Sequence, residues 1–369
     1  MRRKVHALVE RIAQSGAVSV AEFMAAALGD PEFGYYRAQE PFGAAGDFVT
    51  APEISQMFGE LVALWCLDLF TQLGEPPRLS LVELGPGRGT LMADLWRAAQ
   101  IRPAFRAAAR LHLVETSPLL RRRQAEALAG VAAHWHEDFA ECARTDAEAP
   151  LIVIANEFFD ALPVHQLVRA DEGWRERTVV FDAAEERLVF SVSESESELA
   201  ALVPAGLGDA PRGSLFEISA AGRNLMAEIA GHIESASGGT LIIDYGHAQS
   251  GLGDTLQSVR AHRRHDVLSD PGSADITAHV DFGALGAIAR ERGAQVFGPV
   301  PQGDFLRRLG IETRARALLA QATPSQARDI AASLARLVDP AGMGMLFKAM
   351  AVTSAGLVPA GFAPPCGPA

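Results

Sequence analysis

The stretch VELGPGRGTLMADLWRA, residues 82–98, decides the fold of this 369-residue chain. A short apolar run leads into glycines at positions 85, 87 and 89, and a pattern typical of a helix follows at once. Glycine allows tight turns and close approach of the backbone to a ligand, and the N-terminus of a helix attracts electronegative groups. We therefore expect a ligand-binding turn between a strand and a helix.

The alternation of strand and helix continues along the chain and indicates an α/β fold. Strands that are apolar along their whole length and separated by helices predict a parallel sheet covered on both faces. In such sheets, ligands bind beyond the carboxyl ends of the strands. The expected elements are strands at 78–85, 110–115, 150–157 and 239–246, helices at 90–100, 117–130 and 220–235, and an antiparallel pair formed by 294–300 and 343–352.

The spacing of the glycines distinguishes among nucleotide ligands. A dinucleotide-binding turn has the pattern G-x-G-x-x-G, but here Gly89 comes one residue early and Thr90 stands in the last position. The chain has no GK[ST] sequence, which excludes a P-loop. G-x-G-x-G behind an acidic residue, here Glu83, is typical of class I methyltransferases. S-adenosylmethionine is therefore the expected cofactor.

Polar residues follow the other expected strands. A carboxylate at Glu115 suits the two ribose hydroxyls of a nucleoside, and Asp138 beside Phe139 suits the amino group and face of adenine. Structural roles are the alternatives, with Glu83 accepting from loop amides and Glu115 as a charge at a helix N-terminus. The cofactor-binding residues expected so far are Glu83, Gly85, Pro86, Gly87, Gly89, Glu115, Thr116, Ser117, Asp138, Phe139 and Asn156.

Composition excludes several kinds of partner. The net charge of −12 gives no basic footprint for nucleic acid, and no window is apolar enough for membrane insertion. Cys66, Cys142 and Cys366 lie far apart and form no CxxC pair, so we expect neither a disulfide framework nor a metal site. A reducing cytoplasm, that of a bacterium, is the expected location.

Several stretches of the chain resemble the MidA family, which includes a mitochondrial complex I assembly factor. The most specific are GDFVTAPEISQMFGE (46–60) and ANEFFDALPVHQ (155–166), and Ala51 stands where the family often has serine. The others are the glycine turn at 82–97, LVETSPLLRRRQ (113–124), LIIDYGH (241–247), DTLQSVRAH (254–262), DITAHVDF (275–282) and MGMLFKAM (343–350). The resemblance implies a Rossmann-like class I methyltransferase with a seven-stranded sheet, an N-terminal helical segment and an inserted hairpin and helix.

The resemblance also implies methylation of a protein arginine, with a subunit of the respiratory NADH dehydrogenase, complex I, as a possible partner. Carboxylates bonded to the guanidinium would hold it and concentrate electron density on one nitrogen. Glu157 is the first candidate and Asp160 the second, with a turn cap ahead of Pro163 as the alternative for Asp160. We expect His279, oriented by Asp281, to pair with a carboxylate or to carry away the released proton, the alternative being a core histidine.

The motif before the sheet supplies further candidates. We expect Asp47 to contact the target, Phe48 to pack on the cofactor, and Thr50 to lie at the substrate. Thr50 and Glu53 also have the spacing of a capping box for the next helix, which is the alternative explanation for them.

The end of the strand at 239–246 supplies two more candidates. We expect Tyr245 to line the substrate pocket and Asp244 to lie there with it, holding His247. Hydrogen bonds that fix the loop are the alternative explanation.

The chain is expected to comprise five segments. Ser19 and Glu22 predict a capping box in the first of them, and the inserted segment holds a hairpin of 174–181 with 186–193. The acidic run at 193–198 is expected to be a solvated loop. The segments are 1–75 (N-terminal helices and a cofactor-covering loop), 76–165 (first half of the cofactor-binding core), 166–238 (the insertion), 239–355 (second half of the core) and 356–369 (a tail without fixed structure).

Three other functions are open at this level. A methyltransferase of a small molecule or of another residue would use the insertion to form a closed pocket. A non-catalytic assembly chaperone would bind the cofactor only for structure, which the intact glycine turn disfavours. The glycine spacing also disfavours an NAD-dependent oxidoreductase.

Overall fold

The computed structural model describes residues 2–38 and 49–363, and the chain divides into two units. The sheet unit, named for its parallel sheet, comprises Val49–Phe159, Leu225–Gly246 and Leu285–Ala369. The hairpin unit comprises Met1–Phe48, Asp160–Asn224 and His247–Ala284. These cuts fall at other places than the boundaries of the five expected segments, which stay a prediction.

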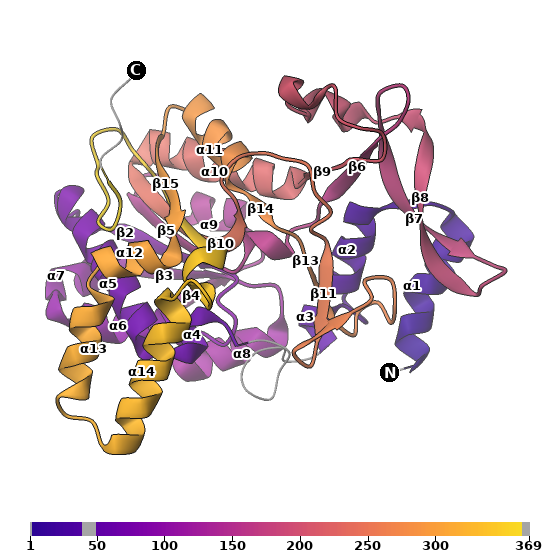
Figure 1. Cartoon of the computed structure of the whole chain (residues 1–369). Helices are drawn as coiled ribbons and strands as arrows, with labels where there is room; N and C mark the ends of the chain where they lie inside the picture. Colours follow the sequence, from indigo (N-terminus) through magenta and orange to yellow (C-terminus); the bar gives the residue numbers. More distant parts are fainter. Residues whose placement is uncertain (1, 39–48, 364–369) are drawn as a thin grey trace. The chain divides into compact units, whose positions relative to one another are not determined.

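The expected α/β fold is confirmed in the sheet unit. Among the described residues, the main path of its sheet runs β15-β16-β10-β5-β2-β3-β4 (Figure 1). The neighbours from β10 to β4 are parallel, and β16 is antiparallel to both β10 and β15, as expected. The strands are β2 (Leu79–Leu84), β3 (Ala109–Val114), β4 (Ala133–His136), β5 (Leu151–Asn156), β10 (Gly238–His247), β15 (Gln295–Pro301) and β16 (Phe347–Thr353).

Both faces of this sheet are buried, which explains why its strands are apolar throughout. Ile152 and Ile154 of β5 belong to one core cluster with Trp65, whereas Val153 between them points to the opposite face and is also fully buried. The helices between and beside the strands are α4 (Ala51–Ile54), α5 (Gln56–Gln72), α6 (Thr90–Ala98), α7 (Pro103–Ala108), α8 (Pro118–Ala127), α9 (Phe139–Thr145), α10 (Ala220–Ala236), α11 (Phe282–Glu291), α12 (Gln302–Arg308), α13 (Ile311–Leu319), α14 (Pro324–Val338) and α15 (Met343–Leu346).

The chain after β16 packs back onto the core instead of leaving it. Leu357 and Phe362 are each only 9% exposed. The ring centroid of Phe362 lies 5.2 Å from that of Phe305 and 6.5 Å from that of Phe297. The first part of the segment expected to lack fixed structure therefore belongs to the core, and residues 364–369 lie outside the described part of the chain.

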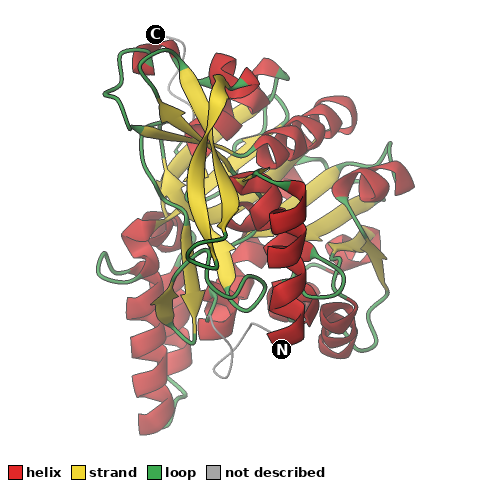
Figure 2. Ribbon diagram, turned by 90° about the vertical axis from the view of Figure 1, so that its right-hand side faces the viewer, coloured by secondary structure: helices red, strands yellow, loops and turns green. Residues whose placement is uncertain are grey.

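The hairpin unit contains the expected hairpin and the two N-terminal helices. β7 and β8 pair antiparallel, and α1 lies beside β7 (Figure 2). The predicted capping box is present, because the Ser19 hydroxyl accepts from the Glu22 amide and the Glu22 carboxylate accepts from the Ser19 amide. The elements of this unit are α1 (Arg2–Ser15), β1 (Val18–Ser19), α2 (Val20–Gly29), α3 (Tyr35–Ala38), β6 (His165–Arg169), β7 (Trp174–Asp182), β8 (Arg187–Glu196), β9 (Leu215–Ile218), β11 (Gln257–Arg260), β12 (Arg263–His265), β13 (Asp275–Thr277) and β14 (Val280–Asp281).

The prediction of a solvated loop at 193–198 is wrong for most of that run. Strand β8 continues to Glu196, which pairs with Arg175 of β7. Pairing with a long neighbouring strand satisfies the backbone, and opposite charges across the ladder favour this register. The acidic side chains stay largely exposed, which is why the composition of this run is typical of a loop.

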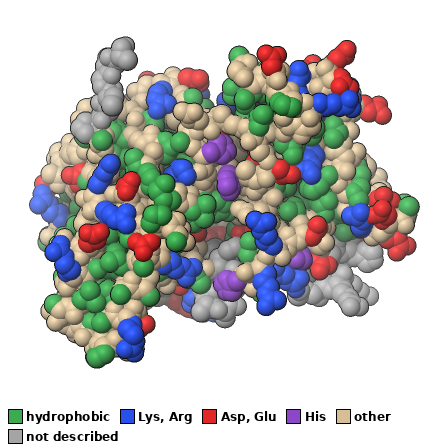
Figure 3. Space-filling view, in the orientation of Figure 1, with side chains coloured by type: hydrophobic (Ala, Val, Ile, Leu, Met, Phe, Trp, Pro, Cys, Tyr) green, Lys and Arg blue, Asp and Glu red, His purple; other side chains and the backbone are tan. Residues whose placement is uncertain are grey.

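The surface carries charges of both signs. On the face drawn in Figure 3, basic and acidic side chains are interspersed. Among the helices of the described residues, none combines the length and apolar character that a membrane crossing requires.

Candidate functional site

The glycine turn between β2 and α6 has the form expected from its sequence. Gly85, Gly87 and Gly89 all have positive φ, at 60°, 54° and 84°, where side chains other than glycine are strained. A Cβ on Gly85 would stand 2.6 Å from Cδ2 of Phe158, so the close packing of that ring also requires glycine. The Gly89 amide donates to the carbonyl of Pro86 at 2.8 Å, which closes the turn at the start of α6.

Gln124 in α8 ties this turn to the ends of two strands. Its Nε2 donates to the carbonyl of Gly87 at 2.8 Å and to the carboxylate of Glu115 at 3.1 Å. Its Oε1 accepts from the indole Nε1 of Trp135 at 2.8 Å, and the residue is completely buried. Gln124 was not among the residues expected from the sequence, where the available signal was a polar residue on the inner face of the helix that follows Glu115.

Glu115 follows β3 and is held in place by its own loop. Its Oε1 accepts from the amide of Ser117 at 2.8 Å, across Thr116, and Ser117 is the N-cap of α8. Burial raises the pKa of Glu115, while the hydrogen bonds from Ser117 and Gln124 oppose that shift. A carboxylate has about four acceptor positions, so the bonds to the loop are compatible with the predicted bond to a ribose.

Glu83 lies in β2 just before the turn and is 3% exposed. Burial raises the pKa of this carboxyl to about 8. Within the described part of the chain, its Oε2 has no hydrogen-bond partner. The carboxyl is therefore an acidic group held without a counter-charge beneath the glycine turn.

Asp138 and Phe139 have structural roles in this arrangement. Asp138 is the N-cap of α9, with Oδ1 accepting from the amide of Glu141 at 2.7 Å, and Phe139 is 3% exposed. Their contact with an adenine stays a prediction.

Glu157 follows β5 in a conformation that is rare for a residue with a side chain. Its φ is +50°, and its amide donates to the carbonyl of Ile243 in β10 at 2.9 Å. Its Oε1 accepts from the amide of Ala51 at 3.0 Å and from Nδ2 of Asn156 at 3.3 Å. Strained backbone of this kind persists only where the surroundings hold it, and it clusters at functional sites.

Asp244 holds the loop that carries Glu157. This completely buried carboxylate accepts from the amides of Phe158 and Phe159 at 3.1 and 3.0 Å through Oδ2, and from the amide of Tyr245 at 2.9 Å through Oδ1. The expectation that Asp244 holds His247 stays a prediction. Tyr245 packs edge-on against Phe347, with ring centroids 5.4 Å apart.

Asn156 ends β5 between these groups. It is 9% exposed, and its Oδ1 is a buried acceptor that lacks a hydrogen bond within the described residues. The ends of β2, β3, β5 and β10 thus bring the glycine turn, Glu115, Asn156, Glu157 and Asp244 into one region of the sheet unit.

The capping box expected from Thr50 and Glu53 is absent. Thr50 is the N-cap of α4, but its side chain makes no capping hydrogen bond. The Glu53 carboxylate instead accepts from the hydroxyl of Thr90 and lies 3.5 Å from the guanidinium of Arg88. Glu53 therefore bonds to α6 and the glycine turn. Charge-assisted hydrogen bonds to those groups are stronger than the capping bond that it would make with α4.

Asp160 and His279 belong to the hairpin unit and are described there. The carbonyl of Asp160 accepts from the amide of Ala278 at 3.0 Å, so its loop lies beside the one that carries His279. The amide of His279 donates to the hydroxyl of Thr255 at 2.8 Å, and Thr255 in turn bonds to the Glu217 carboxylate. Asp47 and Phe48 lie outside the described residues.

Asp281 has a local structural role, and its expected orientation of His279 stays a prediction. Oδ1 of Asp281 accepts from the amide of Ala284 at 2.9 Å, at the start of α11. Its Oδ2 lies 3.9 Å from Nε2 of His247. A carboxylate ahead of a helix satisfies the first amides of that helix, and this local role takes Asp281.

Comparisons with known proteins agree with this arrangement. The model of a family of S-adenosyl-L-methionine-dependent methyltransferases matches residues 61–300. The mitochondrial protein arginine methyltransferase NDUFAF7 of Danio rerio is 36% identical over 366 residues, covering 94% of this chain and 85% of the relative. The Drosophila melanogaster homologue is 37% identical, covering 93% and 83%. A Burkholderia thailandensis protein crystallised with S-adenosyl-homocysteine has a TM-score of 0.81 and 28% identity, covering 98% and 94% of the two chains.

The names of these relatives correct one expectation. The cysteines predict a reducing bacterial cytoplasm, whereas the curated relatives are named as mitochondrial proteins. The cysteines indicate only a compartment that keeps thiols reduced. This property alone does not distinguish a bacterial cytoplasm from a mitochondrion.

We predict that Gln124→Met weakens the binding of S-adenosylmethionine about tenfold, which corresponds to about 1.4 kcal/mol. The change leaves the Gly87 carbonyl, the Glu115 carboxylate and the Trp135 indole without a shared partner. Calorimetric titration with the cofactor measures the effect, and Gln100→Met at the exposed surface is the matched control. Unchanged affinity in Gln124→Met would show that Gln124 does not shape the site.

We also predict that Glu83 makes the protein less stable as the pH rises. With a pKa of about 8 against an ordinary 4.5, the folded state keeps a proton that the unfolded state has lost. Between these values the free energy of unfolding therefore falls, by up to about 1.4 kcal/mol per pH unit. Denaturant unfolding at a series of pH values should show this fall in the wild type and in the exposed control Glu126→Gln, and a shallower fall in Glu83→Gln, where other buried carboxyls such as Glu115 remain. Parallel curves for all three proteins would contradict it.

Proposed function

Because the chain belongs to the MidA family of S-adenosylmethionine-dependent methyltransferases, we propose that it methylates an arginine side chain of a protein. The curated relatives are named protein arginine methyltransferases, which supports this class of substrate. The family resemblance further suggests a subunit of the respiratory NADH dehydrogenase, complex I, as the target. Glu157 is proposed as the residue that binds the guanidinium.

The residues of the sheet unit fit the cofactor. The turn presents bare backbone at Gly85, where a Cβ would collide with Phe158, and at Gly89, where a Cβ would stand 3.1 Å from Cα of Gln124. The Oδ1 of Asn156 and the carboxylate of Glu115 are buried acceptors, which suit the ammonium and hydroxyl donors of S-adenosylmethionine. When bound, this cofactor supplies a methyl group on a sulfonium, which is strongly electrophilic.

Arginine is a difficult nucleophile because its guanidinium stays protonated and its charge is delocalised. A carboxylate bonded to two of its nitrogens concentrates electron density on the third and fixes its direction. A carboxylate that is already fixed before the substrate arrives needs no reorganisation during the reaction. The site therefore needs an acidic group whose position the protein determines.

The geometry of Glu157 is the observation that carries this proposal. Its backbone is held at a φ of +50° by the bond to Ile243, and its Oε1 accepts from the Ala51 amide. The side chain is half-buried directly beyond β5, at the carboxyl edge where ligands of such sheets bind. These properties support Glu157 as the group that binds and orients a guanidinium.

Other expected residues keep proposed roles. Asp160 is proposed as a second carboxylate and His279 as the group that accepts the released proton. Tyr245 and Thr50 are proposed to contact the target, as is Asp47. Phe48 is proposed to pack on the cofactor, together with Asp138 and Phe139 at the adenine.

The test is methyl transfer from labelled S-adenosylmethionine into an extract of source cells that lack the gene. We expect a discrete labelled protein that yields methylarginine on hydrolysis. Because removing one preorganised electrostatic partner typically costs 100-fold or more, Glu157→Gln should lower the rate by about that factor. Its affinity for S-adenosylmethionine should stay close to that of the wild type.

Glu186→Gln is the matched control, because Glu186 also has a positive φ, of 51°, but lies in the turn between β7 and β8. It should methylate like the wild type. Label in small molecules instead of protein would contradict the proposed substrate class. An extract without label, at confirmed cofactor binding, would contradict arginine methylation itself, and full activity in Glu157→Gln would remove Glu157 from the site.

A further inference from the structure

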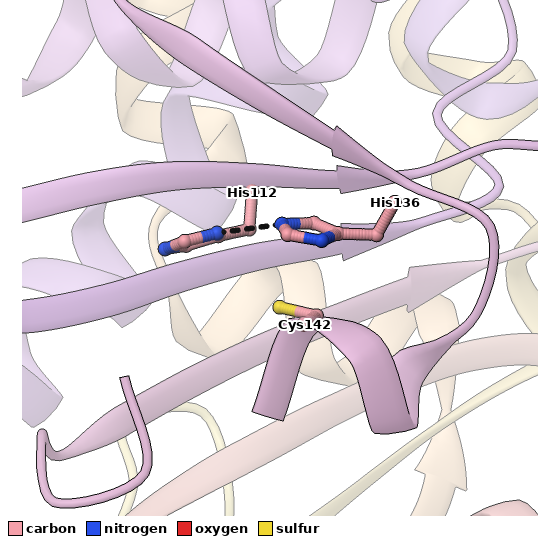
Figure 4. A group of neighbouring side chains, drawn as sticks. All are labelled: His112, His136 and Cys142. Carbon is pink, nitrogen blue, oxygen red and sulfur yellow. Dashed lines mark hydrogen bonds between the residues drawn. The ribbon is translucent and has the colours of Figure 1, made fainter. Parts of the chain in front are cut away.

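Two histidines and a cysteine gather at the β4 edge of the sheet unit. His112 comes from β3, His136 from the end of β4 and Cys142 from α9, and the sulfur points toward the two rings (Figure 4). Their ligand atoms all lie within 4.8 Å of one another. The three residues are 2%, 5% and 3% exposed. They come together only through the fold, since their spacing in the chain matches no metal-binding motif.

The hydrogen bonding of the two rings is incomplete. Nδ1 of His112 lies 2.9 Å from Nε2 of His136, and burial beside His136 holds the pKa of His112 at about 4. When two neutral imidazole rings share one hydrogen bond, one N–H and one nitrogen lone pair of the two rings still lack a partner, whichever ring donates. Within the described residues, Nε2 of His112 and Nδ1 of His136 have no hydrogen bond. Buried polar atoms in this state are costly.

We propose that His112, His136 and Cys142 bind a zinc ion. Two imidazole nitrogens and one thiolate form a donor set that zinc favours, whereas calcium and magnesium prefer oxygen ligands. Two nitrogen ligands of a tetrahedral zinc stand about 3.4 Å apart, so the ring nitrogens need to separate only slightly. Metal binding releases the thiol proton to solvent, as a metal–thiolate bond requires.

Glu141 lies against the ring nitrogen of His136 that does not face His112. Its Oε1 lies 3.8 Å from Nδ1 of His136, and it precedes Cys142 in α9. A carboxylate at the second nitrogen of a ligating histidine accepts from its N–H and orients the ring toward the metal. The three protein ligands from β3, β4 and α9 leave one position of a tetrahedral zinc to a water molecule.

The position of the site gives the ion a role in the cofactor region. The carbonyl of His136 accepts from the amide of Glu115 at 3.0 Å, and Asp138 follows His136 by two residues. An ion that joins β3, β4 and α9 would fix the strand ends that carry Glu115 and Asp138. The sequence predicted no metal site because cysteine spacing detects only ligands that are close in the chain.

The test is titration of the reduced full-length chain, without a histidine tag, with Co²⁺ as a spectroscopic probe for Zn²⁺. We expect one equivalent to produce the visible bands of tetrahedral cobalt together with a thiolate-to-cobalt charge-transfer band. Added Zn²⁺ should remove both bands by competition and raise the melting temperature. Wild-type protein that shows no thiolate-to-cobalt band would overturn the proposal, and this result does not depend on any variant folding.

Variants assign the ligands. Cys142→Ala should abolish the charge-transfer band and weaken Zn²⁺ binding by roughly 100-fold or more, since even the loss of an outer-shell partner costs 10–100-fold. Cys66→Ala, at the other buried thiol of the described residues, and Cys366→Ser should keep the band. His134→Ala is the matched control for the ligand variant His112→Ala. The His134 ring stacks on that of His112 but is not part of the proposed zinc site. A band that survives in Cys142→Ala or disappears in Cys366→Ser would place the metal elsewhere and contradict the assignment.

Discussion

The bond between the Asp244 carboxylate and the amides of Phe158 and Phe159 is the constraint on which the candidate site depends. It ties the end of β10 to the loop after β5 and fixes the backbone turn at Glu157. The same loop sets Phe158 against Gly85, so the carboxylate loop and the glycine turn are packed against each other. A completely buried residue thus determines where Glu157, the proposed guanidinium-binding residue, stands.

A second layer of polar contacts completes the cofactor side. Gln124 connects the glycine turn to Glu115, and Glu53 connects α4 to the same turn through Thr90. These are buried or half-buried side chains that hold backbone and carboxylates in fixed positions before any ligand binds. Preorganisation of this kind is where methyltransferases that act on a poor nucleophile gain rate, because the site does not have to rearrange.

The sheet and the glycine turn were predictable because their signals are local. Apolar runs located β2, β3, β5 and β10, and the glycine spacing marked the turn. Contacts between distant segments were not predictable. The hydrogen bonds of Gln124, Glu53 and Asp244 depend on which side chains and backbone groups the fold brings together. The acidic composition around Glu196 wrongly predicted a loop, because exposed strands and loops both carry acidic residues. The cluster of His112, His136 and Cys142 required the packing of β4 and α9.

The most direct test of the central constraint is a double-mutant cycle of Asp244→Asn and Glu157→Gln. Asparagine keeps the shape of Asp244 but turns one acceptor into a donor that faces a backbone amide. If Asp244 acts by positioning Glu157, Asp244→Asn lowers methyl transfer with little change in cofactor affinity, and the double variant is no slower than Glu157→Gln alone. Effects that multiply in the double variant, at unchanged melting temperature, would contradict the account.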